Sequence, residues 1–355
     1  MEPVTHILTG AVLARAGFNR RAAYATIAMA IAAELPDIDT LWSAAGPIYG
    51  LEHHRGITHT FLAAPVLAGL VTAGFYLVHR HRSQTRVAAT RIKVAPVHWG
   101  WFFAGTVVAL LSHLLLDWTN NYGLRPFFPF NPHWYAGSFV FIFEPVLFAI
   151  LVAALVLPSL FGLINAEVGS RKAKLAGRPS AILALIAIAA FYLFRVNERD
   201  RAIQIARQDQ PTDAGRIFAS PHPLDPFLWH MVTETPSTYQ LSTVDTRRQV
   251  TWSRSPADTL YKPETTIALL AAKRTFLGRI YLDWSQYPVL SEAPDQQDPN
   301  HPLVRITFAD ARFLYNASFL HGREHPPLSG SVLLDMQAPE DQRVVEQTMD
   351  GRVQH

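Results

Sequence analysis

The stretch HHRGITHTFLAAPVLAGLVTAGFYLV, residues 53–78, places three histidines directly before a long run of apolar residues. Residues 61–78 carry no charged side chain. Apolar runs of roughly 17 to 25 residues are long enough to cross the hydrocarbon core of a bilayer. The stretch therefore predicts a membrane helix whose beginning carries His53, His54 and His59.

Other apolar runs lie on both sides of this stretch, nearly all of them before residue 197. The runs of about spanning length are 58–79, 97–117, 139–164 and 180–196. Two shorter Ala-rich segments, 3–17 and 21–35, leave two alternatives open, a full crossing or partial insertion. We therefore predict a mainly α-helical, polytopic membrane domain over residues 1–196, with about six hydrophobic helices, some of them short.

From Asn197 onward the composition changes to that of a soluble domain. Apolar residues alternate with other residues in three places, which predicts strands with one buried face: Ile280, Leu282 and Trp284; Val304, Ile306 and Phe308; Val332, Leu334 and Met336. The segment KPETTIALLAAKRTFLG predicts a helix with Pro263 in its first turn and Gly278 at its end. Residues 197–355 are thus expected to form a small α+β domain.

The distribution of basic residues predicts the orientation of the membrane domain. If all six segments cross, the loops on one side contain Arg55 and Arg125 as their only basic residues. The loops on the other side contain Arg15, Arg20, Arg21, Arg80, Arg82, Arg86, Arg91, Lys93, Arg171, Lys172, Lys174 and Arg178. Lys and Arg concentrate in cytoplasmic loops. We therefore expect both termini, and the C-terminal domain, outside the cytoplasm of a bacterial inner membrane.

The composition excludes some site chemistries. The chain has no cysteine, so disulfides and thiolate metal sites are excluded, and any metal must be held by His, Asp or Glu. The net charge of +3 does not favour a nucleic-acid partner, because the basic residues lie in loops predicted to be cytoplasmic. The start MEPVTHILTG lacks a basic region before its apolar residues, so no removable signal peptide is expected.

Eight residues of metal-ligand type in the first half fall on the same predicted, external face, whereas His79, His81 and His98 lie at the opposite face. His113 and Asp117 are spaced i, i+4, which puts both side chains on one side of a helix. Ionisable residues in or near membrane segments are costly and usually functional. Individually, Asp37 or Asp39 could cap a helix, and His6 could be a core histidine. The candidate ligands are His6, Asp37, Asp39, His54, His59, His113, Asp117 and Glu144.

Four motifs resemble those of the YdjM-type family of membrane-bound, metal-dependent hydrolases, described as LexA-regulated in some bacteria: THILTG, LPDID, HRGITHT and SHLLLDWTNNYG. The segment ASPHPLDPFLWHMVTET, residues 219–235, resembles the start of an extracytoplasmic domain of some members. The family is regarded as distantly similar to zinc-dependent phospholipases C and P1-type nucleases. The resemblance implies ligand roles for His6, Asp37, Asp39, His54, His59, His113 and Asp117. Glu144, in FIFEP, stands where an aspartate is expected.

Nitrogen and oxygen ligands favour Zn²⁺, with Mn²⁺ or Fe²⁺ as alternatives, and the number of ligands predicts two or more ions. Such a site favours hydrolysis of a phosphoester or lipid-linked substrate at the outer face of the membrane. Arg55 and Asp39 are the candidate catalytic residues. Arg55 could hold a phosphate oxygen or, alternatively, pair with Asp37 or Asp39. A metal-binding transporter or a non-enzymatic membrane regulator is the alternative function. The expected partners are membrane lipids and the substrate, without nucleic acid, and the oligomeric state stays open.

The loop GLRPFFPFNPHWYAG, residues 123–137, is rich in aromatic residues and proline. It follows His113 and Asp117 in the chain and leads to Glu144. Aromatic side chains are enriched at the bilayer interface. We interpret the loop as a lip over which a membrane-associated substrate reaches the site. Alternatively, its rings anchor the helix ends or pack beneath the C-terminal domain.

Overall fold

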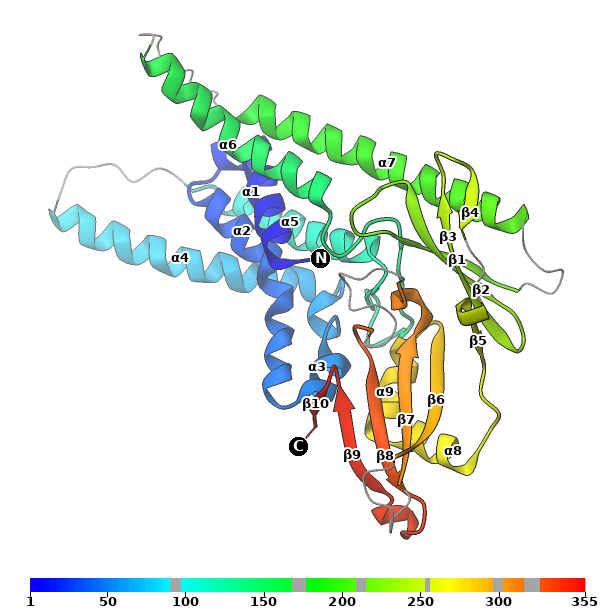
Figure 1. The fold of residues 1–355 in the computed structure, drawn as a ribbon. Coiled ribbons are helices and arrows are strands. Elements are labelled where there is room, and N and C mark those ends of the chain that lie inside the picture. Colours follow the sequence, from blue (N-terminus) through cyan, green and yellow to red (C-terminus); the bar gives the residue numbers. More distant parts are fainter. Residues whose placement is uncertain are drawn as a thin grey trace. The chain divides into compact units, whose positions relative to one another are not determined.

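The structure is a computed structural model that describes residues 1–89, 97–167, 177–208, 215–252, 256–295, 303–315 and 326–354. Several basic residues used to predict the orientation lie outside the described residues: Arg91, Lys93, Arg171, Lys172 and Lys174. The chain divides into two compact units (Figure 1). The first, here the helical unit, comprises Met1–Ile38 and Arg55–Asn197. The second, here the sheet unit, comprises Asp39–His54 and Glu198–His355.

The helical unit is built around two short helices, α1 (Pro3–Ala16) and α2 (Ala25–Glu34). They pack on each other and on α5 (Trp99–Thr119), and α1 also contacts α6 (Pro145–Glu167). Small residues allow this close approach. A Cβ atom added at Gly10 would lie 2.3 Å from the carbonyl oxygen of Met29. The alanines of α2 belong to the buried core of this unit, which positions the ends of α1, α2 and α5 near one another.

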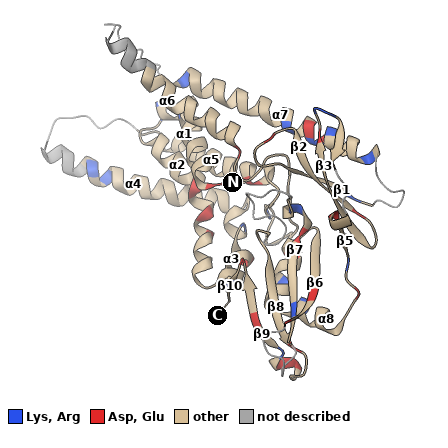
Figure 2. Ribbon diagram, viewed as in Figure 1, with Lys and Arg blue, Asp and Glu red and all other residues tan. Residues whose placement is uncertain are grey.

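Three described helices contain stretches long and apolar enough to cross a membrane: Ala63–Ser83 within α4 (Ala63–Ala89), Trp99–Thr119 in α5 and Arg178–Gln208 in α7. In α6 the apolar stretch, Pro145–Leu160, is shorter. The predicted mainly helical membrane domain is confirmed at this level, but six spans are not. Helices α1 and α2 have 14 and 10 residues, whereas a crossing needs about 20. Figure 2 shows the charged residues of α7 concentrated toward its C-terminal half.

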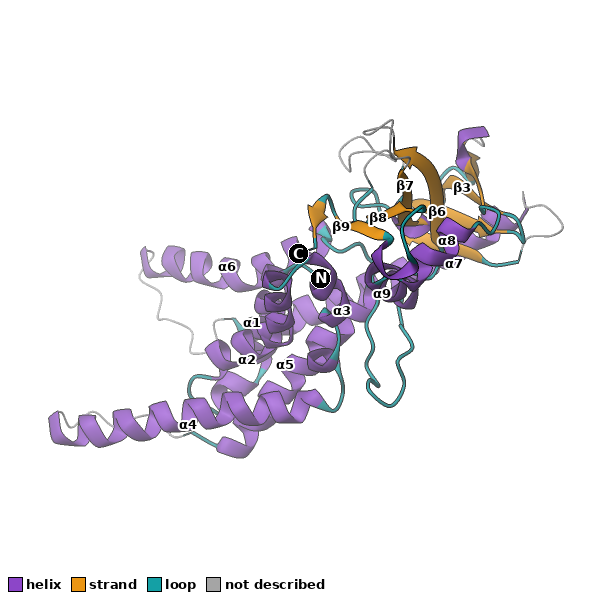
Figure 3. Cartoon of the chain, turned by 90° about the horizontal axis from the view of Figure 1, so that it is seen from below, coloured by secondary structure: helices purple, strands orange, loops and turns teal. Residues whose placement is uncertain are grey.

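The sheet unit contains two antiparallel sheets, and Figure 3 shows that the strands of the described chain belong to this unit. The first sheet has the order β1-β2-β3-β4, with β5 paired to β3. Its strands are β1 (Ile217–Pro221), β2 (Leu228–Glu234), β3 (Thr238–Asp245), β4 (Val250–Trp252) and β5 (Thr259–Tyr261). The second has the order β10-β9-β8-β7-β6. Its strands are β6 (Pro288–Asp295), β7 (Leu303–Asp310), β8 (Gly330–Asp335), β9 (Val344–Met349) and β10 (Arg352–Val353). The prediction of a helical region followed by a sheet-rich domain is confirmed.

Two of the three predicted strands lie in β7 and β8, where Ile306, Phe308, Val332 and Leu334 are buried. The third prediction was wrong, because residues 280–284 belong to a helix. The segment predicted as one helix forms α8 (Ile267–Arg274) and the start of α9 (Phe276–Trp284).

Local capping explains this difference. The Thr275 side chain accepts a hydrogen bond from the backbone N–H of Gly278 and so begins a new helix. Gly278 does not end a helix. A Cβ atom at this position would lie 2.1 Å from the Ala272 carbonyl oxygen, so glycine permits the tight junction between α8 and α9.

Residues 39–54 belong to the sheet unit, in which they contact α9, β9 and the residue that follows β10. Helix α3 (Pro47–His53) lies in this segment. The side chain of Gln354 accepts a hydrogen bond from the N–H of Ile48 (3.0 Å) and donates one to the carbonyl of Ala45 (3.3 Å). The rings of Tyr49 and Phe276 also pack together, with centroids 5.0 Å apart.

Candidate metal centre

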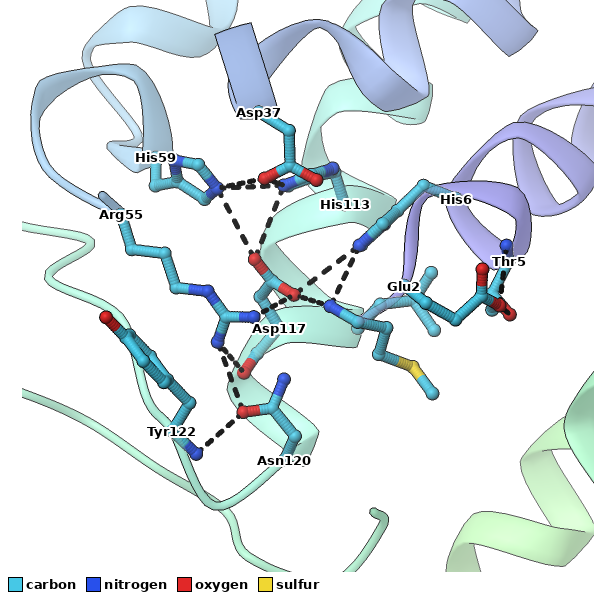
Figure 4. A network of polar contacts seen from close by, with 12 residues as sticks. Glu2, Thr5, His6, Asp37, Arg55, His59, His113, Asp117, Asn120 and Tyr122 are labelled. Atoms are coloured by element: carbon cyan, nitrogen blue, oxygen red, sulfur yellow. Dashed lines mark hydrogen bonds and ion pairs between the residues drawn. The ribbon is translucent and has the colours of Figure 1, made fainter. Parts of the chain in front are cut away.

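Four predicted ligands of the helical unit converge from three segments of the chain (Figure 4). Asp37 lies in the 3₁₀ stretch that follows α2, and His59 ends a short 3₁₀ turn before α4. His113 and Asp117 lie one turn apart near the C-terminal end of α5. His59, His113 and Asp117 are completely buried, and Asp37 is partly buried.

The distances between these side chains are short enough for all four to bind one cation. One ligand atom from each of the four residues lies within 4.8 Å of the others. The Nε2 atoms of His59 and His113 are 3.0 Å apart, and each is 3.4 Å from Asp117 Oδ2. Asp37 Oδ1 lies 3.1 Å from His59 Nε2 and 3.6 Å from His113 Nε2.

The second nitrogen of the His113 ring indicates which of its two nitrogens carries a lone pair. His113 Nδ1 lies 2.7 Å from the carbonyl oxygen of Ala33, which accepts but cannot donate, so Nδ1 carries the proton and the neutral ring directs the Nε2 lone pair into the cluster. Metal-ligating histidines typically bond their other ring nitrogen to such an oxygen. His59 Nδ1 lies 3.1 Å from the Thr58 hydroxyl, which can accept in the same way.

Without a cation this arrangement leaves a buried acceptor unsatisfied. If His59 is protonated at Nε2, it can donate to Asp37. Asp117 Oδ2, however, has no hydrogen-bond partner among the described residues. Burial alone would raise the pKa of Asp37, but its hydrogen bond with His59 and the neighbouring His113 lower that pKa to about 2. Ionised carboxylates and imidazole lone pairs that converge in a buried site fit a divalent metal.

His6 borders this group from α1. Its ring stacks on His113 with centroids 3.8 Å apart, and its Nε2 lies 3.4 Å from Asp117 Oδ1. The α-amino group of Met1 contacts the same carboxylate oxygen and lies 3.0 Å from His6 Nε2. His6 is therefore a neighbour of the four-residue group, through Asp117.

The remaining predicted ligands lie outside this four-residue group. Asp39 and His54 form a pair within the sheet unit, with Oδ1 and Nδ1 3.1 Å apart. Glu144 precedes α6 in the helical unit, and its charge interacts with Arg195. His53, the weaker candidate, stacks on Trp42 and lies close to the Tyr49 carbonyl.

Arg55 lies in the helical unit, where its guanidinium is buried against Asp117. Nη2 lies 3.0 Å from Asp117 Oδ1, while Nη1 donates to Asn120 Oδ1 (3.1 Å) and to the Gly123 carbonyl (2.9 Å). The guanidinium also lies over the Tyr122 ring, 4.7 Å from its centroid. In its contacts within the helical unit, Arg55 thus joins the carboxylate of Asp117 to the turn that follows α5.

Two further residues near this group are absent from the predicted set. Glu34 directly precedes the LPDID motif. Burial and the nearby charge of Asp37 raise its pKa to about 8, and its Oε2 has no hydrogen-bond partner in the described chain. Asn120 follows α5 within the TNNYG part of a recognised motif. Glu34 could have been recognised in the sequence as an acidic residue next to LPDID. Asn120 could be recognised only from its contacts in the structure.

Comparison with known proteins identifies the family. A family profile described as YdjM inner membrane protein matches residues 1–202. The chain belongs to this family. The match covers the helical unit, including the four converging residues, and confirms the resemblance inferred from the motifs.

One curated relative is an uncharacterised protein, YfhP, of Bacillus subtilis (strain 168). It is 25% identical to the chain over 163 residues, which represent 44% of this chain. The chain spans 45% of that relative's length. No solved structure matches the chain significantly. Family membership and the apolar helices support location in the inner membrane, and the Asp–His group supports a metal site.

Proposed function

We propose that this protein is a membrane-bound, metal-dependent hydrolase whose centre is formed by Asp37, His59, His113 and Asp117. The observation that carries the proposal is the approach of two imidazole Nε2 atoms to 3.0 Å beside a buried carboxylate oxygen that has no hydrogen bond among the described residues. Such a group is stable when a cation lies among the lone pairs. Most buried polar atoms in folded proteins have a hydrogen-bond partner, so an unsatisfied carboxylate oxygen in this position calls for an explanation.

The donor set favours Zn²⁺ over softer or harder ions, with Mn²⁺ and Fe²⁺ as alternatives. When bound, such a metal would supply Lewis acidity that activates water for hydrolysis. Two imidazoles and two carboxylates of the chain would hold it, and water would take a further position, as in zinc sites that expand to five ligands during catalysis. Arg55 keeps Asp117 oriented through its contact with Oδ1. Two or more ions, with Asp39, His54 and Glu144 as additional ligands, stay a prediction.

A phosphoester or lipid-linked compound is the proposed substrate. Two ligands lie on α5, which is itself long and apolar enough to cross a membrane. His59 lies four residues before the spanning stretch of α4. Substrates dissolved in the bilayer would therefore meet the site at the membrane surface. The distribution of Lys and Arg supports the outer face.

Metal analysis combined with a hydrolysis screen tests the proposal. The full-length protein, purified in lipid nanodiscs, is analysed for Zn, Mn and Fe by mass spectrometry. It is then incubated with phospholipids, lipid-linked phosphates and soluble phosphodiesters. We expect bound divalent metal and hydrolysis that a chelator abolishes and added metal restores. Protein that is folded, contains no metal and takes up none from solution would refute the proposal.

A further inference from the structure

Asn120 occupies the position directly after α5, three residues beyond Asp117. Its side chain is completely buried. The backbone leaves the helix here with an extended conformation (ψ 175°), so the side chain turns into the loop that returns past Arg55. Asn120 is therefore a buried polar group beside the proposed metal ligands.

The orientation of the Asn120 amide is fixed by three donors. Oδ1 accepts hydrogen bonds from Arg55 Nη1 (3.1 Å), the N–H of Tyr122 (2.9 Å) and the N–H of Gly123 (3.4 Å). Exchanging the amide oxygen and nitrogen would place an NH₂ group against three donors, which is unfavourable. Figure 4 shows the nitrogen turned away from Arg55 and Tyr122.

The remaining group, Nδ2, has no hydrogen-bond partner among the described residues. A buried donor left unsatisfied is unfavourable for the folded state. Because Arg55 polarises the amide through Oδ1, Nδ2 becomes a stronger donor. The same guanidinium contacts Asp117 Oδ1, so the donor and the candidate metal ligand are held by one side chain.

We infer that Asn120 Nδ2 is a substrate-binding donor that holds an anionic oxygen of a phosphate group next to the metal centre. This inference rests on the proposed hydrolase function and specifies phosphate as the chemical group recognised. A fixed donor that is not needed by the protein fold can bind such an oxygen without reorganisation. Phosphate oxygens are strong acceptors and match a donor placed beside cationic groups.

The test uses Asn120→Asp in the full-length, metal-loaded protein in nanodiscs, with inorganic phosphate as the probe. Aspartate keeps an acceptor for Arg55, Tyr122 and Gly123 but lacks the donor. Metal content is measured by mass spectrometry and phosphate affinity by calorimetry. We expect unchanged metal content and a phosphate dissociation constant at least about tenfold higher, the effect of losing a hydrogen bond to a charged group.

Two further variants separate the lost donor from other effects. Asn121→Asp adds the same charge one residue away and should leave phosphate affinity within about twofold of wild type. Asn120→Ser changes no charge and shortens the side chain, so it should also weaken phosphate binding, and it replaces Asn120→Asp if that variant does not fold.

The outcomes distinguish this inference from the proposed function. Wild-type phosphate affinity in a metal-loaded Asn120→Asp or Asn120→Ser variant would overturn the role of Asn120 alone. Equal losses in Asn121→Asp and Asn120→Asp would attribute the effect to charge and would also overturn it. A wild-type protein that binds metal but no phosphate rejects the phosphate assignment. A wild-type protein that binds no metal rejects the hydrolase proposal itself.

Discussion

Each unit buries an aspartate completely, but the two carboxylates differ in how their charge is compensated. In the sheet unit, Asp310 Oδ1 accepts from the N–H and Nε of Arg312, both at 2.9 Å. Its Oδ2 accepts from Arg312 Nη2, from the Ser285 hydroxyl and from the N–H of Gln286. In the helical unit, Asp117 Oδ1 contacts Arg55, whereas Oδ2 has no hydrogen bond among the described residues.

This difference separates a structural carboxylate from a candidate ligand. Both oxygens of Asp310 are satisfied by Arg312, Ser285 and Gln286, so the pair needs nothing from outside. Asp117 instead faces two imidazole nitrogens at 3.4 Å, an arrangement that an external cation would complete. Burial and charge alone do not identify a metal site. The unsatisfied oxygen, together with the two facing imidazole nitrogens, supports one at Asp117.

The largest expected effect is the loss of metal when this oxygen is removed. Replacing Asp117 or His59 with Ala should reduce bound metal to background and abolish hydrolysis. Each replacement removes one of four ligands from a buried group. Insertion should persist, because it depends on the apolar stretches of α4, α5 and α7. Metal content of purified protein and fractionation with membranes measure the two effects.

His53→Ala is the matched control, because His53 lies next to the motif but contacts Trp42 and the Tyr49 carbonyl. It should retain metal. Full metal content in both Asp117→Ala and His59→Ala would show that neither residue is a metal ligand. Asp117 would then not differ from Asp310 in the way proposed.

The second prediction tests the satisfied carboxylate. Replacing Arg312 with Met leaves Asp310 buried without its cation, which should cost the sheet unit about 3–5 kcal/mol of unfolding free energy. Replacing both residues, Asp310→Leu with Arg312→Met, should cost much less, because no buried charge remains. Hydrogen exchange of β6 and β7 in the full-length protein measures the stability. Equal losses of stability in the single and double variants would contradict the interpretation of Asp310 as a carboxylate compensated by Arg312. Metal content should not change in either variant.

The third prediction concerns the pH dependence of the same pair. Burial alone would raise the pKa of Asp310, but the charge and hydrogen bonds of Arg312 lower it below the ordinary value. The pair therefore contributes its full stability at pH values above about 3.9, the pKa of an aspartate in the unfolded chain. This contribution is lost as the pH falls through the lower pKa that Asp310 has in the folded protein. Stability measured by urea unfolding should fall on acidification, and the fall should be smaller in the double variant. An identical acid dependence in both proteins would exclude this origin.

The helices of the first half were largely predictable, whereas the number of them long enough to cross the membrane was not. Long apolar runs indicate α4, α5, α6 and α7 by length alone. Helices α1 and α2 are ended by backbone features, the turn at Gly17 and the 3₁₀ stretch from Leu35. Residues 280–284 were mistaken for a strand, because three alternating apolar residues also fit a short amphipathic helix once Thr275 caps it.

The types of ligand were predictable, but which of them would form the four-residue group was not. His59, His113 and Asp117 stand out as ionisable residues beside apolar runs. Asp39 follows Asp37 by only two residues, yet it belongs to the sheet unit with His54. This division follows from bonds between residues 45–48 and Gln354, more than 300 positions away. The amide of Asn120 became informative only through its tertiary partners.

The fourth prediction tests the residue that compensates the other oxygen of Asp117. Arg55 uses two nitrogens, Nη2 for Asp117 and Nη1 for Asn120 and Gly123. Lysine has one nitrogen and cannot make both sets of contacts. Arg55→Lys should weaken metal binding about 10- to 100-fold, as changes to groups that orient a ligand do. Competition with a chelator of known affinity measures this. If affinity is unchanged while phosphate binding is lost, Arg55 holds the substrate instead.

The smallest effect is expected at the loop of residues 123–137, which the structure places beside the beginning of α4. The N–H of Phe61 donates to the Pro126 carbonyl (3.0 Å), and the rings of Phe61 and Phe127 lie 5.4 Å apart. Phe127 and Phe130 are 48% and 85% exposed, whereas Trp134 is buried beneath Arg125. The exposed rings thus continue the apolar surface of a helix able to cross a membrane.

If these rings admit a lipid substrate, Phe127→Ser with Phe130→Ser should raise KM for the lipid about three- to tenfold, because each ring loses part of its apolar burial. KM for a soluble substrate with the same headgroup should not change, since the metal ligands remain. Tyr261→Ser removes a ring that is 76% exposed in the sheet unit and should affect neither substrate. Equal changes for lipid and soluble substrates would show that the loop anchors or packs the helix ends. A selective change would extend the contrast between the units: the helical unit would then use its unsatisfied carboxylate to hold the metal and its exposed aromatic rings to admit the substrate.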